Sequence, residues 1–306
     1  MADKRCKSDP IRQHWVPRFY LRYVATPETR DTENPLVWVF SKESGEPKLT
    51  STRQIAAQSF LYSPKDCLGA SKLDMEKELE ALEAIMSPIW RIVSREFVNF
   101  LANEEIRKGL ALFVSILHLR HPARLSEVDK IHEKIVAECE AMPTDNAGRP
   151  IIESVEIGGE LRAFDNSGWH EYKAAGREEK KRIFVDAIRR NATHGAEILL
   201  RKRWYIVFSQ KPVFMTTDTP VTVFNRNHKA FGLATPGTSI YFPLCPTRVL
   251  VMDDDRVQPN GLYHPLLDDT RSSVPFNKAA WHHAKRFMIS PRHTDEVCAE
   301  LLAEHE

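Results

Sequence analysis

The sequence predicts an α+β fold, with a helical layer from the N-terminal half packed on a largely antiparallel sheet from the C-terminal half. Apolar residues recur at helical spacing between residues 72 and 142. From residue 204 onward, short β-branched and aromatic segments alternate with turn-forming residues instead. Because the helices come first and the strands follow as linked segments, this order favours α+β over an alternating α/β fold.

Three helices are expected in the first half of the chain. Residues 71–74 fit a capping box that starts the first helix, and Pro88 is expected to kink it or split it in two. Asn103 can cap the second helix, which should end before Pro122. The third is expected to be capped near Ser126 and to carry an apolar face made of Ile131, Ile135, Cys139 and Met142.

The second half is expected to contain a hairpin, a helix and the main sheet. Paired glycines at 158–159 accept the backbone of a tight turn and predict a hairpin. A helix should follow over 177–203, and two more, near 277–287 and 294–304, should close the chain. The segments expected as strands are 36–40, 204–208, 213–216, 220–224, 239–244 and 247–252.

The chain of 306 residues is expected to form a single large domain over 1–306. A subdivision is open, into a mostly helical part over 1–145 and a part over 146–306 with the hairpin, a helix and the sheet. The five cysteines, at 6, 67, 139, 245 and 298, form no CxxC pair. Reduced thiols and a cytoplasmic location are therefore expected, without a membrane span.

Charge and missing motifs limit the classes of function. The chain has 43 Lys and Arg against 42 Asp and Glu, which excludes a strong overall field for nucleic acid but leaves a local basic patch open. Walker, GxGxxG, HExxH and GxSxG motifs are all missing from the sequence. Common nucleotide-binding, zinc-peptidase and serine-hydrolase classes are therefore disfavoured. Nothing indicates an oligomer, and nucleic acid stays open as a partner.

Several motifs, taken in order, resemble a known family. The segment His14–Arg22 reads HWVPRFYLR, similar to an opening signature H-[YW]-V-P-[QR]-F-Y-L-R. The further matching segments are 120–124 (RHPAR), 216–221 (TTDTPV), 242–246 (FPLCP) and 284–287 (AKRF), together with Asn277. On these motifs the chain resembles the domain of unknown function 4238 family over nearly its whole length. The resemblance implies a shared fold and a site location but no reaction.

Ionisable residues in these motifs suggest a hydrolase site. His14 could move a proton near neutral pH, and Glu83 and Asp218 could serve as catalytic carboxylates. The same two carboxylates could hold a divalent cation such as Mg²⁺ or Mn²⁺. Asp218 is expected on a loop that leaves a strand, where site residues commonly lie. Each residue also has a structural alternative, as a capping, buried or solvated group.

Other polar residues could complete such a site. The candidates for binding an anion are the arginines Arg18, Arg22, Arg120 and Arg286. The remaining site candidates are Glu76, Thr217 and Asn277.

Two hypotheses about function follow. The first is a metal-dependent phosphodiesterase or nuclease, a hydrolase acting on a phosphodiester or nucleic-acid-like substrate. The alternative is a non-catalytic binding module for an anionic ligand, a peptide or a protein partner.

Overall fold

The computed structural model describes residues 12–66, 68–97, 100–157, 160–163, 165–227 and 231–303. The helices, in chain order, are α1 (Arg18–Tyr23), α2 (Asp74–Arg95), the 3₁₀ turn η1 (Phe100–Ala102), α3 (Glu104–Leu119), α4 (Pro122–Glu140), α5 (Trp169–Lys173), α6 (Arg177–Arg201), α7 (Asp269–His283) and α8 (Thr294–Leu302). The strands are β1 (Arg12–His14), β2 (Leu36–Ser41), β3 (Pro47–Ser51), β4 (Ala57–Ser59), β5 (Ser154–Ile157), β6 (Glu160–Ala163), β7 (Arg203–Phe208), β8 (Thr216–Thr217), β9 (Thr222–Asn225), β10 (Thr238–Cys245), β11 (Arg248–Asp253), β12 (Leu262–Pro265) and β13 (Phe287–Ser290).

The predicted α+β class is confirmed. The main sheet has the strand order β12-β7-β11-β10-β9, and the smaller sheet has the order β3-β2-β13-β8. The pairs β1–β4 and β5–β6 stand apart from both. Every pairing between these strands is antiparallel except that of β12 with β7. The chain thus returns after β11 to add one parallel strand at the edge.

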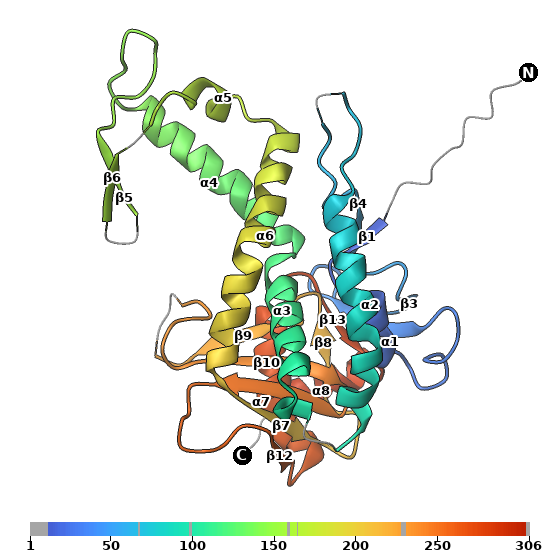
Figure 1. Cartoon of the computed structure of the whole chain (residues 1–306). Helices are drawn as coiled ribbons and strands as arrows, with labels where there is room; N and C mark the ends of the chain where they lie inside the picture. The colour runs from blue at the N-terminus through green and yellow to red at the C-terminus, as the bar shows by residue number, and fades with distance from the viewer. Residues whose placement is uncertain are drawn as a thin grey trace, which may run out of the picture.

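The long helices α2, α3 and α6 run side by side over the main sheet (Figure 1). Their inner faces are apolar, and Trp90 of α2 reaches the sheet, where its Nε1 donates to the carbonyl of Leu244 at 2.9 Å. The main buried cluster extends from Trp15 to Ile289 and includes residues on both sides of the boundary considered at 145. The extent of the domain stays a prediction.

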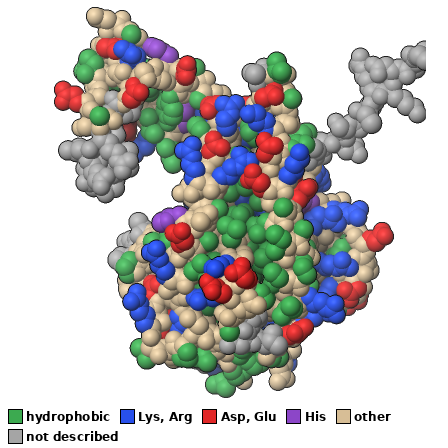
Figure 2. Space-filling view, in the orientation of Figure 1, with side chains coloured by type: hydrophobic (Ala, Val, Ile, Leu, Met, Phe, Trp, Pro, Cys, Tyr) green, Lys and Arg blue, Asp and Glu red, His purple; other side chains and the backbone are tan. Residues whose placement is uncertain are grey.

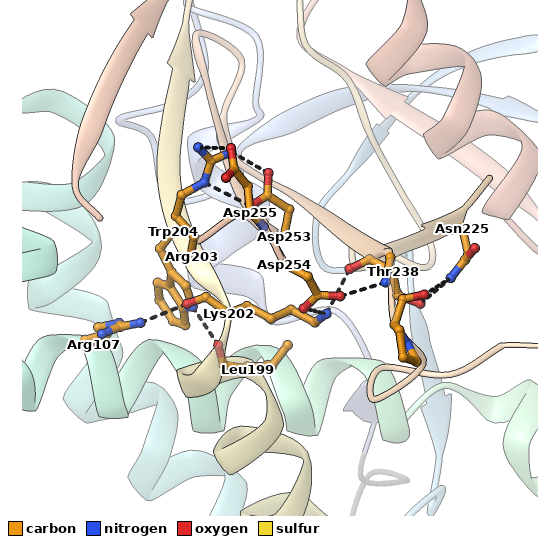
Figure 3. A network of polar contacts seen from close by, with 12 residues as sticks. Arg107, Leu199, Lys202, Arg203, Trp204, Asn225, Thr238, Asp253, Asp254 and Asp255 are labelled. Carbon is orange, nitrogen blue, oxygen red and sulfur yellow. Dashed lines mark hydrogen bonds and ion pairs between the residues drawn. The ribbon is translucent and has the colours of Figure 1, made fainter. Parts of the chain in front are cut away.

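A polar network ties the end of α6 to the sheet (Figure 3). The Lys202 ammonium, 4% exposed, donates to the Thr238 carbonyl at 2.9 Å and to the Asp254 carboxylate at 2.7 Å. Arg203 makes two hydrogen bonds to the Asp253 carboxylate. Because the buried ammonium is paired and hydrogen-bonded, the cost of burying its charge is offset, and the network holds the end of α6 against the sheet.

The expected capping box of the first helix and the expected split at Pro88 were both wrong, while the alternative of a kink at Pro88 stays a prediction. Helix α2 begins at Asp74 after Leu73, without a side-chain cap, so residues 71–74 are not a capping box. The helix also continues through Pro88 rather than splitting there. Pro88 and the residue four before it, Ala84, are both exposed, so water can reach the carbonyl that the proline leaves without a donor.

The expected start and apolar face of the third helix were also wrong. Helix α4 begins at Pro122, not near Ser126, and it projects away from the body of the molecule (Figure 1). Ile131 and Ile135 are 58% and 38% exposed because little of the chain covers this part of the helix. The buried residues of α4 are His132 and Cys139.

The expected cap of the second helix was confirmed. Asn103 caps α3, since its side chain accepts from the Ile106 amide at 3.1 Å. Cys139, Cys245 and Cys298 are free thiols, while Cys6, Cys67 and the paired glycines 158–159 lie outside the described residues. Within the described ranges, none of the helices combines the length and apolar character needed to cross a membrane.

Candidate functional site

Asp218 lies immediately after β8, in the turn toward β9, and its side chain is completely buried. Its Oδ1 accepts from the Lys285 backbone amide at 3.0 Å, and its Oδ2 lies 3.2 Å from His121 Nε2. The turn itself is stabilised by Thr217, whose Oγ1 accepts from the Thr219 amide at 3.1 Å. Asp218 therefore joins three segments that are far apart in the chain.

His121 holds the start of α4 against this turn. It precedes Pro122, the first residue of the helix, and its Nδ1 accepts from the Ala123 amide at 3.0 Å as an N-terminal cap. Since Nδ1 accepts, the proton of the neutral ring lies on Nε2 and is donated to Asp218. Both ring nitrogens are engaged, so His121 is a positioning residue rather than a base.

Trp15 connects this pair to a buried arginine. Its Nε1 donates to the Asp218 carbonyl at 3.1 Å, and its ring packs edge-on against His121, with centroids 5.6 Å apart. The Trp15 carbonyl accepts from Arg120 Nε at 2.8 Å. Arg120 is 1% exposed, and its Nη1 lies 3.1 Å from the Glu83 carboxylate. Together these contacts form a continuous chain from Glu83 to Asp218.

A cavity of about 90 Å³ opens beside this chain. We call it the histidine pocket. Its polar lining residues are His118, His121, Arg124, Glu127, Thr219, His283 and Lys285. They come from the end of α3, the start of α4, the β8–β9 turn and the end of α7 with the residues that follow it. The pocket therefore exists only where these four segments meet.

Two histidines in the pocket are held neutral at pH 7. Burial lowers the pKa of His118 to about 3, and the charge of Arg124 adds to the effect. Arg124 Nη2 lies 3.2 Å from His118 Nε2, and because a guanidinium only donates, this nitrogen accepts. Burial likewise lowers the pKa of His283 to about 4, with contributions from Lys285 and Arg124.

The charges around the cavity favour an anion. Arg124 and Lys285 are cations, and Glu127 offsets one of them through an ion pair with Arg124 at 2.7 Å. The Asp218 carboxylate lies behind the lining and is already hydrogen-bonded twice. Two neutral imidazoles and a net positive charge around a small hollow are suited to one oxyanion.

The structure links three of the predicted residues, Glu83, Arg120 and Asp218, through Trp15. Glu76 lies beside the first two, and its half-buried carboxyl has its pKa raised to about 7, chiefly by burial and then by Glu80 and Glu83. Asp218 and Arg120 thus belong to the framework of the pocket, whereas Glu76 and Glu83 lie behind it on α2.

His14 is in a different setting. Burial, followed by the charges of Arg18 and Arg12, lowers its pKa to about 4, and its Nε2 is buried without a hydrogen-bond partner among the described residues. None of the contacts found for it in the described ranges is with Asp218 or Glu83. Arg22 lies further along α1 and donates to the Arg30 carbonyl at 2.7 Å.

The remaining predicted residues are mostly structural. The Arg286 guanidinium lies 5.9 Å from the centre of the Trp15 ring. Thr217 supports the turn around Asp218. Asn277 is buried and bonds two backbone groups, the Met215 amide and the Val213 carbonyl, so it fixes α7 to the segment before β8.

The described residues contain no group of three or more His, Cys, Asp and Glu side chains placed to hold a metal ion. Glu83 and Asp218, the pair predicted to hold Mg²⁺ or Mn²⁺, are joined through the arginine–tryptophan link rather than facing each other. The divalent-cation hypothesis therefore finds no ligand cluster in this part of the chain.

The sequence analysis did not select His118, His121, His283 or Lys285 for the site. A signal was present, since His118, His121 and Arg124 recur every three residues across Pro122. Interpreting 120–124 as the end of one helix concealed it, because the chain actually changes direction there and a new helix begins at the proline.

Comparison with known proteins gives one match. The family model described as "Protein of unknown function (DUF4238)" matches residues 12–299. Searches of curated proteins and of solved structures gave no match. The match covers all four segments that form the histidine pocket, and it agrees with the resemblance of the His14–Arg22 motif. The chain therefore belongs to the DUF4238 family.

Proposed function

We propose that the histidine pocket binds the phosphate group of a phosphate-bearing ligand. The observation that carries this proposal is the convergence of Arg124 and Lys285 with two neutral imidazoles, those of His118 and His283, on one small cavity. Guanidinium and ammonium groups form short, charge-assisted hydrogen bonds to phosphate oxygens. The volume of about 90 Å³ suits a single tetrahedral group and leaves the rest of a ligand outside.

Sulfate is the probe for this proposal, because its charge does not change over the pH range of the assay. Titration calorimetry with the full chain should show binding that tightens as the pH falls from 7 toward 5. The direction of this pH dependence follows from the pKa of His283. Its pKa is about 4 in the empty pocket, and a bound anion raises it, so the complex takes up a proton that the free protein does not.

Arg124→Gln should weaken sulfate binding about tenfold or more, because hydrogen bonds to charged groups contribute about 1.5–3 kcal/mol. The matched control is Arg182→Gln, which removes a similar arginine paired with a glutamate three residues away on α6. Equal binding by Arg124→Gln and the unchanged protein would contradict the proposal, as would an equal loss in the control.

Phosphodiester hydrolysis is a second candidate, favoured by the two neutral imidazoles on one cavity. One would accept the proton of the attacking hydroxyl or water; for His118 this requires that Arg124 first move its donor from His118 Nε2 to the phosphate. The other, protonated once the anion is bound, would donate a proton to the leaving oxygen. Arg124 and Lys285 would offset the charge on the phosphoryl oxygens.

The test is turnover of a chromogenic phosphodiester. His283→Gln and His118→Gln should each lower kcat by about 100-fold or more, the usual contribution of a general acid or base. His14→Gln serves as the comparison, because the sequence-based hypothesis places catalysis there. Loss of turnover in His14→Gln alone would favour that hypothesis. If the unchanged protein binds sulfate but does not turn over the phosphodiester, the pocket binds an anion without catalysing hydrolysis.

A further inference from the structure

A second cluster of cations lies where α1 meets the C-terminal half of α2. A cavity of about 320 Å³ is lined there by Phe19, Arg22, Tyr23, Arg30, Arg91 and Arg95, along with Asp31 and Ser87. We call it the arginine cleft. Figure 2 shows Lys and Arg side chains gathered over α1 and the neighbouring N-terminal loops, on the side of the molecule where this cleft lies. None of these residues belongs to the histidine pocket.

The arginines of the cleft lack carboxylate partners, unlike many others in the chain. The described arginines found within 4.0 Å of a carboxylate include Arg120, Arg124, Arg149, Arg182, Arg189, Arg203 and Arg292. Among the described residues, no carboxylate lies within this distance of any of the four cleft arginines. The cleft therefore collects four positive charges against the single carboxylate of Asp31, in a chain whose net charge is only +1.

Backbone contacts hold part of this cluster in place without neutralising it. Arg22 Nε donates to the Arg30 carbonyl at 2.7 Å, and Arg30 Nε is buried with no hydrogen-bond partner among the described residues. Arg91 and Arg95 are exposed and one turn apart on α2, so they lie on the same face. A buried donor without an acceptor and several unpaired cations favour an anionic ligand.

The cleft continues into a second hollow along α1. This hollow, of about 280 Å³, shares Phe19, Arg22 and Asp31 with the cleft and adds Arg18, Thr52 and the carboxylate of Glu33 to the lining. The two hollows together carry five arginines against the carboxylates of Asp31 and Glu33. A ligand that follows both hollows would need negative charges at intervals. Tyr23 is partly buried and packs against the main apolar cluster, and the part of its ring that lines the cleft could stack on a flat group.

We propose that the arginine cleft and the adjoining hollow bind the phosphodiester backbone of single-stranded nucleic acid. Such a strand presents one negative charge per nucleotide and a base that can stack. The arginines of the cleft can bind the phosphates, and the Tyr23 ring can stack on a base. A mononucleotide would fill only one of the two hollows. This proposal does not rest on the function proposed for the histidine pocket.

Fluorescence anisotropy with labelled oligothymidylate and oligouridylate tests it on the full chain. Affinity should fall steeply between about 50 and 200 mM salt. Arg91→Gln combined with Arg95→Gln should weaken binding at least about tenfold and reduce the slope of log K against log salt by about 1.4, or 0.7 for each lost contact. Tyr23→Leu should weaken it about tenfold through lost stacking.

The control combines Arg182→Gln with Arg189→Gln, two surface arginines of α6 that are ion-paired. It should bind like the unchanged protein. The proposal fails if the unchanged protein does not bind, or if the control loses as much affinity as the cleft variant. It also fails if a mononucleotide, inorganic polyphosphate or a duplex of the same length competes as well as the single strand, since the cleft would then recognise charge alone.

Discussion

Replacing Asp218 with alanine should lower the free energy of unfolding by about 3–5 kcal/mol, because two donors lose their acceptor and each unsatisfied buried group costs about 1–3 kcal/mol. These donors are the Lys285 amide and His121 Nε2. The change would release α4 and the segment after α7 from the β8–β9 turn. Urea denaturation, monitored by circular dichroism, measures this loss in the free energy of unfolding.

Asp218→Asn distinguishes the two contacts. The amide oxygen can still accept from the Lys285 backbone, but its NH₂ group would face the proton on His121 Nε2. A smaller loss of about 1–3 kcal/mol is expected. As a control, Asp129→Ala removes a carboxylate that is 44% exposed and should change stability by less than about 1 kcal/mol. If Asp218→Ala proved as mild as this control, Asp218 would not be the group that joins these segments.

Glu83→Leu should be comparably costly, by about 3–5 kcal/mol, because it leaves the Arg120 guanidinium buried without its carboxylate. The sequence analysis assigned Glu83 to catalysis. This variant distinguishes that role from the role of Glu83 as the ion-pair partner of Arg120. If Glu83 only supports the fold, Glu83→Leu should lower the thermal midpoint of unfolding together with any activity. A catalytic role lowers kcat while the midpoint stays nearly constant.

A double-mutant cycle measures the coupling free energy between Glu83 and Arg120. Replacing both partners, as in Glu83→Leu with Arg120→Met, should recover part of the loss, since removing a buried ion pair as a whole is often close to neutral. Glu78 lies on α2 like Glu83 and forms an exposed ion pair with Arg189 of α6, so Glu78→Leu should cost less than about 1 kcal/mol. If the double variant were no more stable than Glu83→Leu alone, the coupling between the two side chains would be absent.

The sequence predicted best those elements whose pattern is strong and local. The strands β7, β10 and β11 are apolar segments between turn residues, and α3 has a cap and an amphipathic pattern, so each was placed within a few residues. Elements that depend on distant pairing were missed. Strand β13 was not predicted, since the helix expected near 277–287 reaches only its first residue, and the strand pairs with β2 and β8 from other parts of the chain.

The site was predicted only in part for a similar reason. Asp218 was recognised because a carboxylate after a strand is a local signal. Which groups face it depends on how α4 and the segment after α7 fold back, and no local pattern encodes that. Arg120 was selected as an anion ligand, and this stays a prediction. Its backbone and carboxylate partners give it a supporting role inside the protein, while its Nη2 is buried with no hydrogen-bond partner among the described residues.

The hydrogen bonds around Asp218 also bear on the order of folding. They join residues separated in sequence by 203, 97 and 67 positions. Contacts of such long range are costly in loop entropy and form late, when most of the chain is already in place. A shortened chain that lacks either Trp15 or Lys285 would then keep its long helices but have no finished cavity, so the cavity itself marks the folding of the whole polypeptide.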